Sequence, residues 1–159
     1  MSEFKNKTCC FTGHRNIPQD QRDALMERLK KEIVLLAGNG YCRFIAGGAL
    51  GFDTMAAEAV LALKSQYPTL QLALALPHTE QAKSWSEQDR AVYNDILQRA
   101  DSVTYTSAGR GRGCMQIRNR YMVDHSSFCI CYLAKDNGGT AYTVKYAGKR
   151  GVAVVNIAI

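Results

Sequence analysis

The stretch Asn137-Gly138-Gly139-Thr140-Ala141-Tyr142-Thr143 shortly follows an apolar, strand-like run at residues 128–133. A strand that ends in a double glycine and then opens a helix presents backbone N–H groups that can meet a phosphate. A second stretch of this kind, Ala46-Gly47-Gly48-Ala49-Leu50-Gly51, lies earlier in the chain. The two glycine-rich turns together predict a nucleotide-type ligand held between them.

Strands and helices are expected to alternate along the chain, without repeats or low-complexity tracts. Strand-like runs are predicted at residues 8–12, 43–46, 70–76, 102–106, 128–133 and 152–157. Helices are predicted between them, at residues 19–37, 52–65, 86–99, 114–126 and 140–148. This α/β pattern predicts a mostly parallel central sheet with helices on both faces. Such sheets bind ligands beyond the carboxyl ends of their strands.

Length and composition predict a single domain over residues 1–159. The chain has 159 residues, of which 47% are hydrophobic, enough for one core but too few for two substantial ones. No apolar stretch is long enough to span a bilayer, and no apolar signal segment stands near the first residues. We therefore expect a soluble, cytoplasmic protein with no membrane partner.

The six cysteines are expected to be small buried hydrophobes in a reducing compartment. Cys9 and Cys10 are adjacent, and Cys129 and Cys131 lie in a strand-like run. The sequence contains no Cys-x-x-Cys pair and no cysteine and histidine cluster at zinc spacing. No metal site is therefore predicted.

The positive charge of the chain is largely local. The formal net charge is +6, and four arginines fall in the window between Asp101 and Asp124, which holds no acidic residue. They are Arg110, Arg112, Arg118 and Arg120. This window indicates either an anionic partner bound at one place or a solvated basic surface.

The first glycine turn nearly fits the dinucleotide fingerprint G-x-G-x-x-G, with Ala46 in the first glycine place. Gly47 and Gly48 would let the backbone approach a phosphate, and Gly51 would let a helix lie close to its strand. The turn follows the second strand, and the third strand ends without a ribose-reading carboxylate. An ordinary nicotinamide dehydrogenase is therefore disfavoured, and a tight turn with small-residue packing is the alternative.

Several polar residues follow other predicted strands. At the end of the first strand, Gly13 precedes His14, a candidate proton carrier, and Arg15, a candidate phosphate clamp. Trp85, the only tryptophan, is a candidate for stacking on a base, with core packing as the alternative. Thr140 is a candidate for a phosphate contact or a helix cap.

The predicted helix at residues 114–126 carries a second polar group. Arg118 and Asn119 lack a local partner and are expected to face the ligand, whereas Asp124 is placed four residues after Arg120, a spacing typical of a surface ion pair. Asp53, beside the first glycine turn, is expected either to cap its helix or to accept bonds from a ribose.

Read together, these motifs resemble a known family. The segments Cys10-Phe11-Thr12-Gly13-His14-Arg15, Gly47-Gly48-Ala49-Leu50-Gly51-Phe52-Asp53, Arg118-Asn119-Arg120-Tyr121-Met122-Val123-Asp124 and Gly138-Gly139-Thr140 occur in that order. The chain resembles the YpsA-like family of unknown function in the SLOG superfamily, named for Smf/DprA and Lonely Guy proteins. The resemblance spans nearly the whole chain and implies a Rossmann-like fold and a sensor-type role in binding nucleotides or their derivatives.

The resemblance also indicates a missing catalytic group. Lonely Guy enzymes carry P-G-G-x-G-T-x-x-E, whose glutamate assists cleavage of a ribosyl bond, and Thr143 stands where this glutamate would be. A neutral hydroxyl cannot supply a carboxylate as base or cation stabiliser. Catalysis would then require a replacement, for which His14, Asp53 and Asp124 are the candidates.

The sequence therefore favours a nucleotide-binding protein over an enzyme. The expected ligands are of the ADP-ribose, NAD or AMP type, with no certain cofactor, and a homo-oligomer is a further expectation. The expected ligand-binding residues are Gly13, Arg15, Gly47, Gly48, Gly51, Arg118, Asn119, Gly138, Gly139 and Thr140. The alternatives are a nucleoside-phosphate N-ribosyl hydrolase, as in Lonely Guy enzymes, and single-stranded DNA binding, as in DprA.

Overall fold

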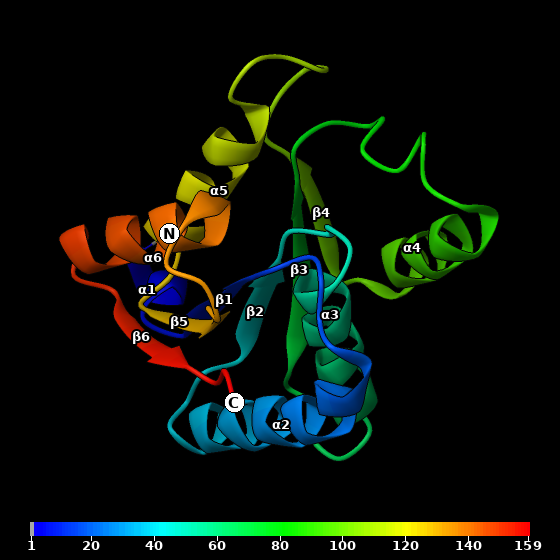
Figure 1. Ribbon diagram of the computed structural model, residues 1–159. Coiled ribbons are helices and arrows are strands. Elements are labelled where there is room, and N and C mark those ends of the chain that lie inside the picture. The colour runs from blue at the N-terminus through cyan, green and yellow to red at the C-terminus, as the bar shows by residue number, and fades with distance from the viewer. Residues whose placement is uncertain (1) are drawn as a thin grey trace.

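The computed structural model describes residues 2–159, with side chains from residue 4 onward, and shows one sheet between layers of helices (Figure 1). The strands are β1 (Thr8–Gly13), β2 (Arg43–Ala46), β3 (Gln71–Leu76), β4 (Ser102–Tyr105), β5 (Phe128–Tyr132) and β6 (Ala153–Asn156). They lie in the order β4-β3-β2-β1-β5-β6, and every neighbouring pair is parallel. The predicted Rossmann-like α/β architecture is confirmed, and the sheet is parallel throughout.

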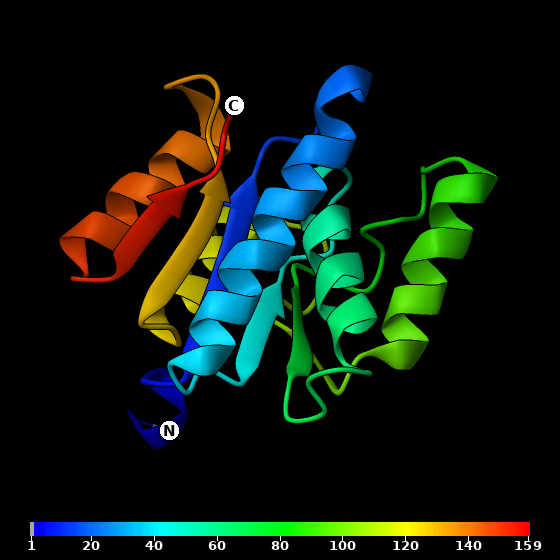
Figure 2. The same ribbon diagram turned by 90° about the horizontal axis from the view of Figure 1, so that it is seen from below.

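The helices are α1 (Ser2–Lys5), α2 (Arg22–Gly38), α3 (Phe52–Leu63), α4 (Glu87–Arg99), α5 (Cys114–Asp124) and α6 (Gly138–Lys149). Helices α2 and α3 cover one face of the sheet, α5 and α6 cover the other, and α4 packs on α3 (Figures 1 and 2). The predicted helix at residues 19–37 begins with a 3-10 turn at Gln19–Gln21. Within residues 2–159, none of the helices has both the length and the apolar character needed to cross a membrane.

An aromatic cluster fixes α3 against the sheet. The rings of Phe11 and Phe44 stack with centroids 6.0 Å apart, and Phe52 at the start of α3 meets Phe11 edge-on at 6.4 Å. All three side chains are fully buried. A Cβ atom on Gly13 would lie 2.5 Å from the ring of Phe52, so α3 can come this close to the end of β1 only because Gly13 has no side chain.

The opposite face of the sheet carries most of the buried cysteines. Cys10, Cys129 and Cys131 pack with Met122 and Val123 of α5. All six cysteines of the chain are free, and only Cys42 is not fully buried. The expectation of small buried hydrophobes is confirmed for the other five, which fill the narrow space between strands and helices.

The strand order places a switch point at β1. From β1 the chain builds outward through β2 and β3 to β4, and it then returns to place β5 on the other side of β1. Ligands of open parallel sheets bind beyond the carboxyl ends of the strands at such a reversal. The two glycine-rich turns follow β2 and β5, the two neighbours of β1, so the end of β1 lies between them.

Candidate functional site

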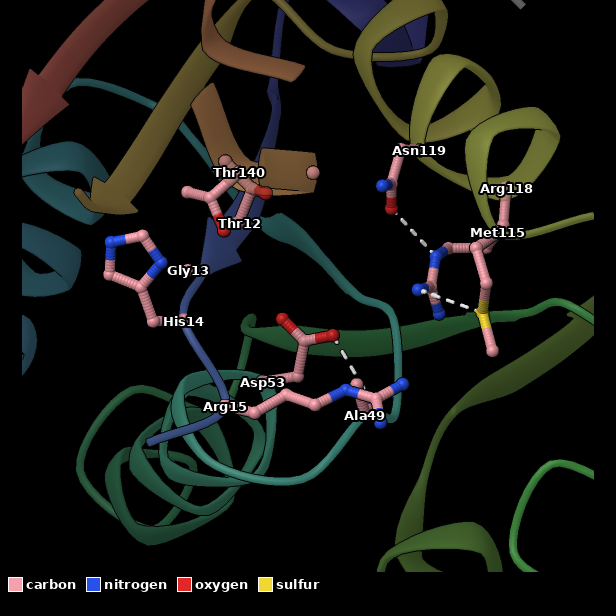
Figure 3. A pocket seen from close by; sticks show the side chains of 11 residues that line it. Thr12, Gly13, His14, Arg15, Ala49, Asp53, Met115, Arg118, Asn119 and Thr140 are labelled. Atoms are coloured by element: carbon pink, nitrogen blue, oxygen red, sulfur yellow. Dashed lines mark hydrogen bonds between the residues drawn. The ribbon is translucent and has the colours of Figure 1, made fainter. Parts of the chain in front are cut away.

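A cavity of about 300 Å³ opens at this edge of the sheet, where β1, the first glycine turn, α5 and α6 meet (Figure 3). Its lining residues are Thr12, Gly13, His14, Arg15, Ala49, Asp53, Met115, Arg118, Asn119, Gly139 and Thr140. Most of these are residues that the sequence marked as candidates, and the parallel sheet brings them together because its strand ends share one edge.

Arg118 joins α5 to the first glycine turn. Its side chain is 4% exposed, and Nη1 donates a hydrogen bond to the carbonyl oxygen of Gly47. Its Nε donates to Oδ1 of Asn119 at 2.8 Å, and Nη2 lies 3.6 Å from Sδ of Met115. Burial lowers the pKa of the guanidinium, but arginine stays protonated in proteins. The cavity therefore has a fixed, preorganised cation in its wall.

Asp53 supplies the only carboxyl group among the cavity-lining residues. It is 7% exposed, and Oδ2 accepts a hydrogen bond from the backbone N–H of Ala49 at 3.2 Å, which closes the turn rather than capping α3. Burial raises the pKa of this carboxyl, while Arg118, the Ala49 N–H and Arg15 act in the opposite direction. Asp53 therefore partly balances the charge of Arg118 and Arg15 across the turn.

The second glycine turn opens α6 toward the cavity. Gly138 has φ of +84°, in the left-handed region, and Asn137 at the N-cap makes no side-chain capping hydrogen bond. The first N–H groups of a helix have no partner within it, so the start of α6 can donate to an anion. Gly139 and Thr140, both in this first turn, line the cavity.

Thr143 lies one helical turn further along α6 and does not face the cavity. Its side chain is 3% exposed, and Oγ1 donates to the carbonyl oxygen of Gly139 at 2.9 Å. This bond within the helix occupies the hydroxyl, and Thr143 is not among the cavity-lining residues. The position of the Lonely Guy glutamate thus holds a neutral group engaged with its own helix.

His14 lines the cavity, but its side chain holds the backbone of the segment that leads from β5 to the second turn. Its Nε2 accepts hydrogen bonds from the backbone N–H groups of Ala134 at 2.9 Å and Lys135 at 3.2 Å. Burial, followed by the nearby charge of Lys135, lowers the pKa of the imidazole. Since Nε2 accepts both bonds, the neutral ring carries its proton on Nδ1, and Nε2 has no lone pair left for a substrate proton.

The remaining predicted residues lie outside this cavity. Asp124 pairs with Nε of Arg150 at 3.2 Å and accepts from the hydroxyl of Tyr146 at 2.8 Å. Its expected partner, Arg120, instead donates to the hydroxyl of Tyr142 at 3.0 Å. The two turns also contain residues that do not line the cavity, namely Gly48, Gly51 and Gly138. Gly47 does not line it either, but its carbonyl oxygen accepts the hydrogen bond from Arg118. Trp85 lines a separate cavity, together with Gly51 of the first turn.

Three lining residues were not predicted: Thr12, Ala49 and Met115. Thr12 immediately precedes Gly13 at the end of a strand, so its place at the sheet edge was a usable signal. Met115 has an apolar side chain that carries no signal of a polar site, and only the tertiary contact with Arg118 brings it to the cavity. Gln81, also behind the first turn, is 7% exposed, and neither its Oε1 nor its Nε2 has a hydrogen-bond partner.

Comparison with known protein families yields one match across most of the chain. The YpsA family model, described as the YspA SLOG family, matches residues 9–153. A UPF0398 protein of Halalkalibacterium halodurans is 33% identical over 129 residues, which cover 79% of this chain and 68% of that protein. An uncharacterized SPbeta prophage-derived protein of Bacillus subtilis, YoqJ, is 32% identical over 145 residues, covering 80% and 85%.

Comparison with solved structures yields DNA processing protein A, DprA. The Helicobacter pylori protein, described by its single-stranded DNA binding mode, superposes with a TM-score of 0.65 at 18% identity over 96% of this chain and 66% of its own. DprA from Streptococcus pneumoniae superposes with a TM-score of 0.66 at 14% identity over 95% and 50%. The chain spans about two thirds and one half of these proteins, and at such identities the likeness shows a shared fold.

Proposed function

This chain belongs to the YpsA family of the SLOG superfamily, and we propose that it binds a nucleotide or nucleotide derivative through its phosphate. The observation that carries the proposal is the buried guanidinium of Arg118 in the wall of a cavity that α6 faces with its N-terminus. A buried cation held by Gly47 and Asn119 costs no reorganisation when an anion arrives. Arg15 adds a second, exposed cation to the same cavity.

The polar groups suit a phosphate better than a carboxylate or a metal. Hydroxyl and backbone donors of Thr12, Gly139 and Thr140 line the cavity beside the two arginines. A phosphate monoester, as in AMP, offers three terminal acceptor oxygens, and the pyrophosphate of ADP-ribose or NAD offers four, enough for donors that come from several elements at once. AMP, ADP-ribose and NAD are the ligand types we propose, with sensing rather than turnover as the role.

Ligand-dependent thermal stability tests this proposal. A ligand that binds only the folded state stabilises it by RT ln(1 + [L]/Kd), which is about 2.7 kcal/mol at a hundredfold excess over Kd. We expect AMP, ADP-ribose or NAD to raise the melting temperature of the wild type and to raise it less in Arg15→Ala. Arg99→Ala, on the exposed side of α4, is the matched control and should respond like the wild type. No shift with any of the three at millimolar concentration would contradict the proposal.

Single-stranded DNA is the second candidate ligand, and surface chemistry near β4 favours it. Arg110 and Arg112 are exposed in the loop that follows β4. A neighbouring cavity of about 350 Å³ combines Lys83 and Arg90 with Tyr93 and Tyr105, and Tyr105 is 45% exposed. Proteins that bind single-stranded DNA combine cations along the phosphate backbone with aromatic rings that stack on the bases. The description of the Helicobacter pylori DprA names single-stranded DNA binding.

Salt dependence tests the DNA alternative. Binding of an oligonucleotide should weaken steeply as salt rises, and each phosphate contact removed should reduce the slope of log K against log salt by about 1. The informative variants are Arg110→Ala and Arg112→Ala, compared with Arg99→Ala. Oligonucleotide binding that does not change with salt, or its absence at low salt, would remove this candidate.

An N-ribosyl hydrolase is the third candidate, and it rests on Asp53. This carboxyl is the only one that lines the cavity, so it is the one acid there that could act on a ribosyl bond. The activity would release free base from a nucleoside monophosphate. If base release occurs and is unchanged in Asp53→Asn, Asp53 is not its catalytic residue.

A further inference from the structure

The cavity of about 300 Å³ that holds the proposed phosphate site is called the anion cavity. A second cavity, of about 330 Å³, lies across the first glycine turn from it, between α3 and α4. Its lining residues are Arg15, Arg22, Leu50, Gly51, Thr54, Glu58, Trp85, Asp89, Val92 and Tyr93. Arg15 lines both cavities. A ligand with its anion on one side of Arg15 and the rest of its body on the other would contact both cavities.

The apolar part of this second cavity has the form of an aromatic corner. The rings of Trp85 and Tyr93 meet edge-on, with centroids 5.2 Å apart and planes at 80°. Both side chains are half-buried, and Leu50 and Val92 complete the apolar lining. In an edge-on pair, the ring that points its edge has neither face covered by its partner, and stacking on an aromatic face accepts any nucleobase.

The polar part carries charges that the protein does not pair. Arg22, Glu58 and Asp89 line the cavity with Arg15. Among the side chains of residues 4–159, none of these four forms an ion pair within 4.0 Å, since the three ion pairs found there involve other residues. Carboxylates accept hydrogen bonds and cannot donate them when ionised. Glu58 and Asp89 therefore favour a ligand that presents N–H donors.

From this juxtaposition we infer that the second cavity is a nucleobase site that selects a purine bearing an exocyclic amino group. The inference rests on the proposed function, since it places the phosphate of the same ligand in the anion cavity. The base stacks in the Trp85–Tyr93 corner, its amino group donates to Asp89 or Glu58, and Arg15 lies over the sugar-phosphate between the two cavities. Inosine nucleotides, which lack the amino group, bind the same phosphate site more weakly.

Binding of four probes to the wild type tests the inference: AMP, GMP, IMP and ribose 5-phosphate. Trp85 is the only tryptophan, so its fluorescence reports occupancy of the corner, and calorimetry gives the affinities. Stacking of one base is worth about 1–3 kcal/mol, so ribose 5-phosphate should bind about 5- to 150-fold more weakly than AMP. IMP has an acceptor oxygen where AMP has its 6-amino group, and it lacks the 2-amino group of GMP, while its N1–H supplies a donor at neither place. IMP should therefore bind about tenfold more weakly than AMP or GMP, because one charge-assisted hydrogen bond is lost.

Two variants separate stacking from amino-group recognition. Trp85→Leu should reduce the affinity for AMP toward that for ribose 5-phosphate, which itself should not change. Asp89→Asn combined with Glu58→Gln removes both candidate carboxylates and should reduce the preference for AMP over IMP. Glu87→Gln removes a carboxylate from the same first turn of α4 without touching the cavity, so it controls for effects on the helix and should retain the preference.

Failure of this inference differs from failure of the proposed function. If ribose 5-phosphate binds as tightly as AMP, or IMP as tightly as AMP and GMP, the nucleobase site is wrong while the phosphate site stands. The same conclusion follows if AMP binds without a change in Trp85 fluorescence. If none of the four probes binds at millimolar concentration, the phosphate site is wrong and the nucleobase site falls with it.

Discussion

The two glycine-rich turns look alike in sequence and differ in how closely they are packed. A Cβ atom on Gly47 in the first turn would lie 2.8 Å from both Nη1 of Arg118 and Oδ2 of Asp53. A Cβ atom on Gly138 or Gly139 in the second turn would meet no atom within 4 Å. The first turn has glycine because the protein fills the space beside it. The second leaves that space open, as a ligand approaching the start of α6 would require.

This contrast divides the work of the site between the turns. The first turn holds charged side chains in place, since Arg118 donates to Gly47 and Ala49 donates to Asp53. The second presents backbone donors and few side-chain contacts. A glycine motif alone therefore does not distinguish a structural turn from a binding turn. The packing around each glycine Cα atom distinguishes them.

Removal of Arg118 should have the largest effect, and it tests whether the first turn is structural. We expect Arg118→Ala to destabilise the protein by about 3 kcal/mol or more, because it leaves the Asp53 carboxyl buried without its nearby cation. It also leaves the carbonyl of Gly47 without this donor. Urea-induced unfolding measures the change. Arg120→Ala, which loses only an exposed bond to Tyr142, is the control and should cost less than about 1 kcal/mol.

The second prediction compares the two turns directly by alanine substitution. Gly47→Ala should destabilise the protein by about 1–3 kcal/mol, since Arg118 and Asp53 must move to admit the methyl group. Gly139→Ala should leave stability unchanged or raise it by up to about 1 kcal/mol, because Gly139 is helical and alanine suits a helix better. The same variant should weaken phosphate binding about tenfold, a loss that is converted from roughly 1.4 kcal/mol.

Chemical unfolding and phosphate-ligand calorimetry together check this pair. Equal loss of stability in both variants would erase the distinction between the turns. Unchanged ligand affinity in Gly139→Ala would mean that no anion approaches the start of α6. Either result would revise the division of roles, independently of the behaviour of Arg118.

Much of the fold follows from local sequence. Every predicted strand and helix is present, because hydrophobic periodicity and glycine or proline boundaries act over a few residues. The short helix α1 was missed, since four residues are too few for a period to show. The gathering of the site at one sheet edge also followed from alternation alone, because parallel strands all end on the same side.

The roles of individual site residues did not follow from local sequence. His14 was a candidate proton carrier, and its bonds to Ala134 and Lys135 join segments 120 residues apart. Arg118 lines the cavity, and the contact with Gly47 that holds it there crosses 71 residues and was not predicted. Such contacts depend on which helices pack together, which the period of one segment does not contain. Asp124 likewise forms its ion pair with Arg150, and not with Arg120 on its own helix.

Gln81 gives a third prediction, in the opposite direction. Neither polar atom of its buried amide makes a hydrogen bond of normal geometry, and the amide lies near enough to the Tyr93 hydroxyl only to lower the pKa that burial raises. Its Nε2 would lie 3.3 Å from a Cβ atom on Gly48, behind the first turn. Gln81→Met keeps the shape of the side chain and removes the unsatisfied amide. We expect stabilisation by about 1 kcal/mol, measured by urea unfolding without ligand. Gln98→Met, at an exposed position of α4, should change stability by less than about 0.5 kcal/mol.

A loss of stability in Gln81→Met would show that the amide has a partner in solution, such as a bound water. The packed character of the first turn would then extend to a buried polar network. Stabilisation would instead show that Gln81 strains the structure behind the turn, as active and binding sites often do.

The smallest expected effect is a loss of stability at acid pH, through His14 and the segment that leads to the second turn. His14 accepts backbone N–H groups of Ala134 and Lys135 on Nε2, so only the neutral ring fits its place, and its pKa is lowered in the folded state. The folded protein then binds fewer protons than the unfolded chain near the ordinary histidine pKa of about 6.5. The contribution of His14 to stability is therefore complete above that pH and is lost as pH falls from it through the lower pKa of the folded state.

Melting temperatures of the wild type and His14→Gln between pH 5 and 7.5 check this sign. Glutamine can accept a hydrogen bond without titrating, so His14→Gln should lose less stability on acidification than the wild type. His125→Gln, which retains His14, should lose as much as the wild type. Hydrogen exchange should place the acid-induced opening at Ala134 and Lys135, on the approach to the second turn, and leave the first turn protected. Opening of the first turn instead would mean that His14 supports the packed region, and the contrast between the two turns would have to be redrawn around β1.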